Sequence, residues 1–499
     1  MALHGNMQFD VTEPDYNYPS LPKYVMYAIG YVTYGLGRST YAFIVAARSF
    51  SAFLGALVGI IIYYIARMLN MGKFISTLAG LLYIASGVAI ANSRFAHNDL
   101  YLQLFTILCL YFVVKFQYTK KIGWLLFSFI SVGMAASSKY TGISMVLLPV
   151  SVLIFLNWEH VRNNVRWFLG VLVSGAVLVI VGYGIGTPQL VISPVKYLSN
   201  AIPAALRFSQ YGFNSGTPVG LYGQWKVLHD TVGAFLYYLY LIGLIWMAIR
   251  IVLYRFGKAD IKRESIMGLV ILGMNILIFD LPFLISINYI SRHFIPFMPL
   301  LALLSAFFIE EVITIVRKRN LNFIEPVLIS VLFIGLVYST LRLVSIALLF
   351  MNDARIPATE YVADIRGYGK SIEYTLYPPV VEKKRFMRAH NYPIYFVKYT
   401  DDVVPTGGRY EYNLGEKGLL ERNTDYFVAD SYTYDRFYES SICDTNPVEC
   451  DFFKRLITGK VTSYYLLTEF KYRLPAWLPQ VSISAVNPDI LIFERVPKP

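Results

Sequence analysis

Ionisable side chains that suit phosphate chemistry occur in three short polar stretches, each of which separates two long apolar runs. They are Arg94, His97 and Asp99 in the stretch 93–99, Lys139 in the stretch 138–140, and Arg292 with His293. A carboxylate at the edge of the hydrocarbon core is costly unless it is paired or used, so Asp99 is a functional candidate. The alternative is an ordinary interfacial loop in which Arg94 and Asp99 pair with each other.

Several basic groups around one acid would suit a lipid phosphate or diphosphate. Arginine binds phosphate through a planar fork, and lysine binds it as a point charge. In a transfer reaction these groups would stabilise the negative charge of the departing phosphate. Asp99 could then take a proton from an acceptor hydroxyl or bind a divalent cation, Mg or Mn. No nucleotide cofactor is expected.

Each candidate residue also has a structural alternative. Lys139 and Arg292 could extend to the lipid headgroups as isolated cations. His97 and His293 could be hydrogen-bonded packing residues. Asp280 lies inside an apolar run, where it is expected to face the interior of the helix bundle and to pair with a base.

The composition predicts a membrane protein. Of the 499 residues, 56% are hydrophobic and 15% are charged, well below the roughly 25% charged residues of soluble domains. Residues 1–350 contain 25 of the 44 Lys and Arg residues but only 12 of the 32 Asp and Glu residues. This basic excess lies in short loops between apolar runs, which indicates membrane topology and membrane-lipid contacts rather than nucleic-acid binding.

Residues 1–350 are predicted to form a polytopic α-helical membrane domain of about ten to eleven spans. The run 21–37 is either a short span or an interfacial helix, because about 20 residues are needed to cross the hydrocarbon core. Ten further apolar runs are expected to be helical, at 42–66, 74–92, 100–118, 122–137, 141–157, 167–186, 229–249, 265–287, 293–312 and 324–350.

Charge separates the loops into two sets. The basic loops, near 67–73, 115–121, 162–166, 250–263 and 317–319, are assigned to the cytoplasm. The other side then receives residues 1–41, 93–99, 138–140, 187–228, 288–292 and everything after 350. The three polar stretches therefore share one outer face, and the chain is expected to be a multi-pass cell-membrane protein with an extracytoplasmic C-terminal domain.

Residues 351–499 are predicted to form a soluble α/β domain. Strands are expected at 371–377, 393–398, 426–430, 462–468 and 489–494, with helices at 358–366, 380–389, 433–440 and 449–458. The domain has no Gly-rich phosphate loop, so no second active centre is expected there. Cys443 and Cys450 could form a disulfide in an oxidising compartment, and the three cysteines lack metal-ligand spacing.

Four motifs in order resemble those of the GT-C membrane glycosyltransferases, in the branch of protein O-mannosyltransferases and aminoarabinose transferases. Residues 93–100, Ser-Arg-Phe-Ala-His-Asn-Asp-Leu, are similar to the second outer-loop motif of that family. Residues 138–149 resemble its next turn, and residues 291–299 resemble its later Arg-Tyr-x-x-Pro-x-x-Pro turn. Residues 17–22, Asn-Tyr-Pro-Ser-Leu-Pro, resemble the segment after its first outer loop.

The resemblance covers nearly all of residues 5–350, and residues 351–499 resemble the outer α/β domain of some members. It implies a lipid-phosphate-linked sugar donor, an inverting transfer, and an acceptor (protein, lipid or glycan) on the outer face. The site residues expected from the residues and the resemblance together are Asp99, Arg94 and His97 as catalytic, Lys139, Tyr140, Arg292 and His293 as substrate- or phosphate-binding, and Asp99 as a metal ligand.

The sequence departs from this family at its start. Members usually begin with a transmembrane helix, followed by an acidic first outer loop that supplies the catalytic base. We interpret the sequence as lacking that first helix; the alternative is that 21–37 is the first span and the acidic loop is absent. Without the acid the resemblance implies an inactive chain, and Asp10, Glu13 and Asp15 are possible substitutes whose spacing does not match the motif.

The leading functional hypothesis is therefore a membrane glycosyltransferase that uses a polyprenyl-phosphate sugar. The alternative is a polytopic transporter or lipid flippase, which predicts ionisable residues along the bundle axis and repeated halves. In this sequence the candidate charges gather at one face, and residues 1–350 contain no defensible internal repeat.

Overall fold

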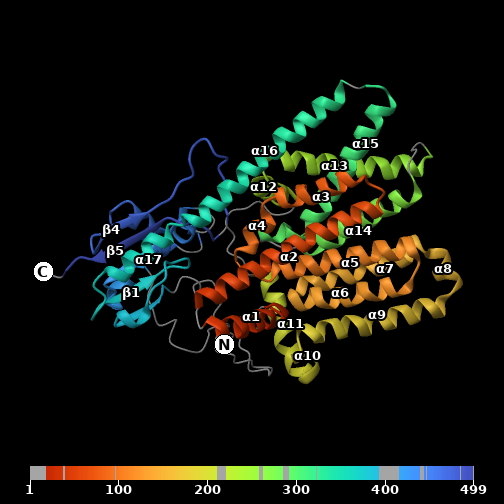
Figure 1. The fold of residues 1–499 in the computed structure, drawn as a ribbon. Helices are drawn as coiled ribbons and strands as arrows, with labels where there is room; N and C mark the ends of the chain where they lie inside the picture. The colour runs from red at the N-terminus through yellow and green to blue at the C-terminus, as the bar shows by residue number, and fades with distance from the viewer. Residues whose placement is uncertain are drawn as a thin grey trace. The chain divides into compact units, whose positions relative to one another are not determined.

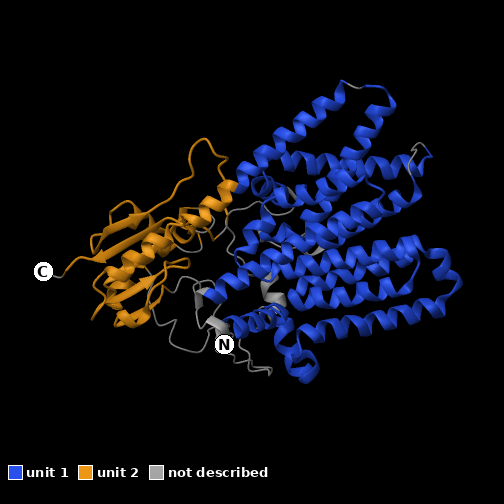
Figure 2. Ribbon diagram, viewed as in Figure 1, with its two compact units in different colours: residues 1–212, 218–343 blue, residues 213–217, 344–499 orange. Residues whose placement is uncertain are grey.

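The computed structural model of the protein describes residues 18–37, 40–95, 97–210, 221–257, 262–284, 291–321, 323–392, 415–438, 443–444, 447–483 and 485–497. The chain divides into two compact units, whose described residues lie within 1–343 and within 344–499 (Figure 2). We call them the membrane unit and the C-terminal unit. The sequence predicted a boundary after residue 350; the division between the units falls between residues 343 and 344, inside a helix.

The described part of the membrane unit is helical. Its helices are α1 (Leu21–Gly37), α2 (Thr40–Met68), α3 (Lys73–Ala85), α4 (Val88–Ser93), α5 (Asp99–Thr119), α6 (Ile122–Ser138), the 3-10 helix η2 (Tyr140–Val146), α7 (Leu147–Ser151), the π-helix η3 (Val152–Leu156), α8 (Trp158–Asn163), α9 (Val165–Gly186), α10 (Gln189–Ile192), α11 (Pro194–Gln210), α12 (Leu221–Val232), α13 (Ala234–Arg255), α14 (Arg263–Leu284), the 3-10 helix η4 (Ser291–Phe297), α15 (Met298–Lys318) and α16 (Ile324–Met351).

Six helical segments among the described residues are long and apolar enough to cross a membrane. They are Ala42–Met68, Asp99–Thr119, Val165–Gly186, Ala234–Arg255, Arg292–Lys318 and Ile324–Asp364. Shorter apolar helices lie at Lys73–Ala85, Ile122–Ser138 and Tyr140–Leu156. The chain is therefore a multi-pass α-helical membrane protein, as the sequence predicted. The count of ten to eleven spans stays a prediction, since these short helices cover less than the usual length.

Four of the expected continuous helices are interrupted. The run 229–249 is divided at Gly233, whose φ is +82°, between α12 and α13. The run 74–92 forms α3 and α4, which are separated at Gly87, whose φ is +73°. The run 141–157 is a succession of 3-10, α and π turns. The run 293–312 begins as the 3-10 helix η4 before α15. Apolar content predicted membrane-embedded segments at these places but did not predict their backbone geometry.

The core of the membrane unit is built from helices that are distant in the sequence. Helix α6 packs between α5 and α9, while α2 packs against α5 and α3, and α15 packs against α13 and α3 (Figure 1). Helix α5 is the most enclosed of the spans, with 72% of its most apolar stretch buried inside the protein. The expected outer loop 187–228 contains α10, α11 and the start of α12; residues 211–220 lie outside the described residues.

The C-terminal unit contains a five-stranded mixed sheet in the order β2-β1-β3-β5-β4. The strands are β1 (Ser371–Tyr374), β2 (Arg388–Asn391), β3 (Tyr426–Asp430), β4 (Tyr464–Phe470) and β5 (Ile490–Arg495). Strand β1 runs parallel to β2 and β3, whereas β5 runs antiparallel to β3 and β4. The helices of this unit are α17 (Arg355–Asp364), α18 (Gly415–Glu421), α19 (Ser431–Tyr434) and α21 (Pro447–Ile457), with short 3-10 turns η5 (Lys383–Arg385) and η8 (Asp435–Tyr438).

The predicted α/β character of the C-terminal unit is confirmed, but one element was assigned wrongly. The segment 380–389, expected to be a helix, contains the short turn η5 and the start of β2. Pairing with β1, which is distant in the sequence, makes β2 a strand, and local periodicity does not report such pairing. The expected strand 393–398 lies outside the described residues.

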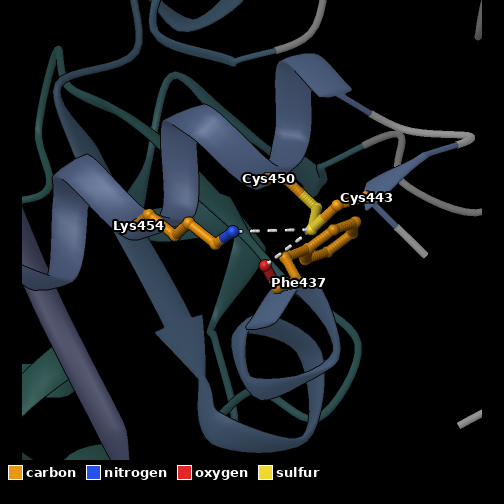
Figure 3. The surroundings of a disulfide bond; sticks show 4 residues. All are labelled: Phe437, Cys443, Cys450 and Lys454. Carbon is orange, nitrogen blue, oxygen red and sulfur yellow. Dashed lines mark hydrogen bonds between the residues drawn. A yellow bond between two sulfur atoms is a disulfide. The ribbon is translucent and has the colours of Figure 1, made fainter. Parts of the chain in front are cut away.

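A disulfide joins Cys443 to Cys450, next to the side chain of Lys454 (Figure 3). Cys450 belongs to α21, and it is buried with Phe452 and Phe453 in one of the hydrophobic clusters of this unit. The remaining cysteine, Cys109, is free and buried in α5. The structure thus contains the pairing that the sequence left open.

Candidate functional site

The candidate site is built where α5 begins. The αL conformation of Gly87 breaks the α3–α4 run, because only glycine adopts a positive φ without steric cost. Helix α4 then ends at Ser93, and a short turn leads to Asp99 in the first turn of α5. A carboxylate in the first helical turn interacts favourably with the partial positive charge of the helix N-terminus.

Asp99 is buried, and it is paired with two nitrogen donors. Its side chain is 1% exposed, and Lys139 Nζ lies 2.7 Å from Oδ1. His97 Nδ1 lies 2.9 Å from Oδ2. The ring of Tyr18 meets the His97 ring edge-on, with 5.5 Å between centroids. The structure therefore brings together Asp99, Lys139 and His97, which the sequence had placed on two separate turns.

Close packing between α6 and the turn after it positions Lys139. Lys139 is the extended residue that follows α6, and its backbone N–H donates to Ala135 O. A Cβ atom at Gly142 would lie 2.5 Å from Ala135 O, so only glycine lets η2 pack this tightly on α6. Asn98 Nδ2 also donates to Ser138 O at 3.2 Å, which ties the start of α5 to the end of α6.

Arg292 comes from the third polar stretch, in η4, which packs against α4 and α5. It lies within electrostatic range of Asp99. Arg292 Nε is buried and makes no hydrogen bond to any of the residues that the structure describes. Two other buried polar atoms that flank Asp99 share this property among the described residues, namely Asn98 Oδ1 and Tyr101 OH. Buried polar groups are normally hydrogen-bonded, so these three atoms are candidates to contact a bound ligand.

A buried glutamine that the sequence reading missed links the elements of the site. Gln103 is fully buried in α5, one turn after Asp99. Its Nε2 donates to Ile295 O in η4 at 2.5 Å, and its Oε1 accepts from Tyr83 OH at 2.8 Å. The sequence signal for Gln103 is an uncharged amide in an apolar run, four residues after the carboxylate of Asp99.

The remaining site candidates are placed as follows. Arg94 is the partly buried residue that follows α4, Tyr140 begins η2, and His293 is partly buried in η4. Their roles stay predictions. The acids Asp10, Glu13 and Asp15, considered as substitutes for a catalytic base, lie outside the described residues.

A divalent cation at Asp99 would need further oxygen or nitrogen ligands besides this carboxylate. The residues that the structure describes contain no group of three or more His, Cys, Asp or Glu side chains that could hold a metal ion. Both oxygens of Asp99 already contact nitrogen donors. The Mg or Mn hypothesis therefore remains a prediction, and no step below depends on it.

Comparison with known proteins connects this region to a family. The family model of the dolichyl-phosphate-mannose-protein mannosyltransferases matches residues 28–183. This segment includes Arg94, His97, Asp99 and Lys139. A comparison with the curated proteins finds no match.

Two proteins of known structure are similar to the chain. The archaeal oligosaccharyltransferase AglB from Archaeoglobus fulgidus, in complex with an inhibitory peptide and a dolichol-phosphate, is 13% identical over 84% of this chain, with a TM-score of 0.49. ArnT from Cupriavidus metallidurans, bound to undecaprenyl phosphate or in the apo state, is 12% identical over 96% of this chain, with a TM-score of 0.47. The match covers 63% of the AglB chain and 88% of the ArnT chain. The resemblance seen in the sequence motifs is thus confirmed over residues 28–183, where the chain is similar to the dolichyl-phosphate-mannose-protein mannosyltransferase family.

Proposed function

We propose that the protein is a membrane glycosyltransferase that moves a sugar from a polyprenyl-phosphate donor to an acceptor on the outer face, with inversion. The observation that carries the proposal is the cluster in which buried Asp99 pairs with Lys139 and contacts His97. This cluster lies within the family-matched segment 28–183 and within electrostatic range of Arg292. The motif resemblance and the bound polyprenyl phosphates of AglB and ArnT agree with this donor class.

Lys139 and Arg292 are proposed to hold the donor phosphate. Lys139 Nζ has three hydrogens to donate, and Asp99 Oδ1 is 2.7 Å from it. The buried Arg292 Nε lacks a hydrogen-bond partner within the described residues, and a phosphate oxygen would supply that partner. When the bond between the sugar and the phosphate breaks, the phosphate leaves with the bonding electron pair. Positive charges that are already in place stabilise this developing charge.

His97 is proposed as the general base for the acceptor hydroxyl. A carboxylate oxygen only accepts hydrogen bonds, so the contact with Asp99 Oδ2 requires the hydrogen of a neutral imidazole to be on Nδ1. Nε2 then carries the lone pair. As the acceptor oxygen attacks the anomeric carbon, Nε2 would take its proton. Asp99 itself is a poor base because both of its oxygens are engaged, so we assign it the task of orienting His97 and Lys139.

The C-terminal unit is proposed to face the extracytoplasmic side. Two observations support this placement. The basic loops, which favour the cytoplasm, lie on the side opposite to residues 351–499 in the topology derived from the sequence. The Cys443–Cys450 disulfide is typical of an oxidising compartment.

The transfer reaction provides the test. Membranes that contain the protein are incubated with dolichyl phosphate carrying labelled mannose, and the label is followed from the lipid into the protein, lipid and glycan fractions. We expect transfer by the wild type and about a 100-fold loss in His97→Ala, which is the low end for removal of a general base. The exposed residue Lys196 supplies a control, Lys196→Met, which should be fully active.

Two outcomes would contradict the proposal. Transfer that is unchanged in His97→Ala would exclude the assigned base. Movement of the labelled lipid across the bilayer without loss of its sugar would instead favour the transporter or flippase alternative.

A further inference from the structure

The segment 471–489, between β4 and β5, leaves the sheet and packs against the end of α16. Leu474 and Val486 are buried against Leu349. Ser345 Oγ donates to Pro479 O at 2.8 Å. All of these residues belong to the C-terminal unit, which includes the last turns of α16 (Figure 2). The segment is therefore fixed to the final two turns of this helix.

The length of α16 sets the level of these contacts relative to the membrane. A helix rises about 1.5 Å per residue, so roughly 20 residues cross a hydrocarbon core about 30 Å thick. Helix α16 has 28 residues and is part of the most extended of the apolar spans. If α16 enters the core near its first residue, Ile324, it leaves the core near residue 344. On this assignment Ser345, which donates a hydrogen bond to the segment, lies at the membrane–water boundary.

A hydrogen-bonded turn of the segment exposes Trp477. Its side chain is 74% exposed, whereas the next residue, Leu478, is buried. Leu478 N donates to Pro475 O, and Gln480 Nε2 donates to Leu478 O at 3.0 Å. The turn therefore presents a large amphipathic ring outward. An indole ring has an apolar body and a polar N–H, and tryptophan is accordingly enriched at the headgroup level of membranes.

The charges of the segment are balanced by local ion pairs. Lys471 pairs with Glu469 at 2.7 Å, and Arg473 pairs with Asp489 at 2.6 Å. Adsorption to anionic lipid depends on unpaired basic residues. The ring of Trp477, rather than charge, is thus the feature suited to a membrane surface.

We infer that the turn 475–479 is a membrane-surface anchor, in which Trp477 inserts into the headgroup layer at the C-terminal end of α16. The occupant of this surface is the lipid interface itself, irrespective of headgroup charge. The anchor would hold the C-terminal unit at the membrane. It rests on the span assignment of α16 and does not depend on the proposed transferase activity.

The test places a nitroxide label on single cysteines in the full-length protein in phosphatidylcholine vesicles. The background variant is Cys109→Ala, because Cys109 is the one free cysteine while Cys443 and Cys450 remain in their disulfide. The label goes to Trp477→Cys or to the control Tyr368→Cys, whose wild-type side chain is 92% exposed in the same unit. Collision rates with oxygen, which partitions into lipid, and with a water-soluble nickel chelate then report the depth of the label.

We expect an oxygen-to-nickel collision ratio several-fold higher at position 477 than at position 368, and no change when anionic lipid is added. Equal ratios at the two positions would overturn the inference. A ratio at 477 that rises only with anionic lipid would also overturn it, because binding would then depend on charge.

Discussion

Replacing Lys139 by methionine should destabilise the membrane unit by leaving a buried carboxylate without its cation. Asp99 is 1% exposed, and Lys139 Nζ lies 2.7 Å from its Oδ1. Removing one partner of a buried ion pair costs about 3–5 kcal/mol. His97 remains on the other oxygen of Asp99, and Lys139 is itself 16% exposed, so we expect about 3 kcal/mol, the low end of that range.

A double-mutant cycle separates this effect from simple loss of packing. In Asp99→Asn/Lys139→Met both members of the ion pair are neutral, so the double variant should recover most of the loss, with a coupling of about 2 kcal/mol. The free energies of unfolding are measured in mixed micelles as the mole fraction of dodecyl sulfate rises. The exposed-site control Lys196→Met should stay within about 0.5 kcal/mol of the wild type. Additive single effects, or a Lys139→Met loss similar to the control, would refute the reasoning.

Three further predictions follow from individual contacts. Gln103→Leu removes the hydrogen bond to η4, so it should raise the KM for the lipid donor more than it lowers kcat; steady-state kinetics with an unchanged KM would count against the link. Burial tends to raise the pKa of Glu373, but its hydrogen bonds, including those from Arg422, outweigh burial and lower that pKa. The stabilising effect of the ionised Glu373 should therefore be present above its unfolded pKa of about 4.3 and be lost as the pH falls below that value. Measured by thermal unfolding, the Glu373→Gln variant should lose less stability on acidification than the wild type. Parallel losses in the two proteins would contradict the assignment. Removing both cysteines of the Cys443–Cys450 disulfide should lower the free energy of unfolding by about 2 kcal/mol, because the loop-closure entropy is lost. Mass spectrometry of the wild type after denaturing alkylation without reductant should find neither cysteine labelled. Labelling of both would contradict an oxidised pair.

Hydropathy predicted the spans well because membrane insertion depends on long apolar runs. The expected runs 100–118 and 122–137 correspond to α5 and α6 within one residue at each end. The break at Gly87 and the 3-10 helix η2 are set by local backbone geometry and close helix contacts. The mean hydropathy of a segment contains no information about either. In the C-terminal unit, β2 depends on pairing with β1 and was predicted as part of a helix.

For the site, the charge pattern of the loops predicted that the stretches of Asp99 and Lys139 share one face, and the structure pairs the two side chains. The sequence could not say which base pairs with which acid, because Arg94, Lys139 and Arg292 were equivalent candidates for Asp99. The packing of α5 on α6 determines that Lys139 pairs with Asp99. The role of Gln103 was missed because it depends on a backbone carbonyl far away in the sequence.

Binding of a lipid phosphate tests the central claim most directly. Native mass spectrometry would compare dolichyl phosphate with dolichol, which lacks the phosphate, for the wild type, for Arg292→Gln, and for Arg48→Gln at an exposed position of α2. A hydrogen bond to a charged group contributes about 1.5–3 kcal/mol, so Arg292→Gln should weaken dolichyl phosphate binding by at least about 10-fold while Arg48→Gln leaves it unchanged. The account predicts tight binding of dolichyl phosphate and weak binding of dolichol by the wild type. Equal binding of the two lipids, or binding that Arg292→Gln leaves intact, would contradict it.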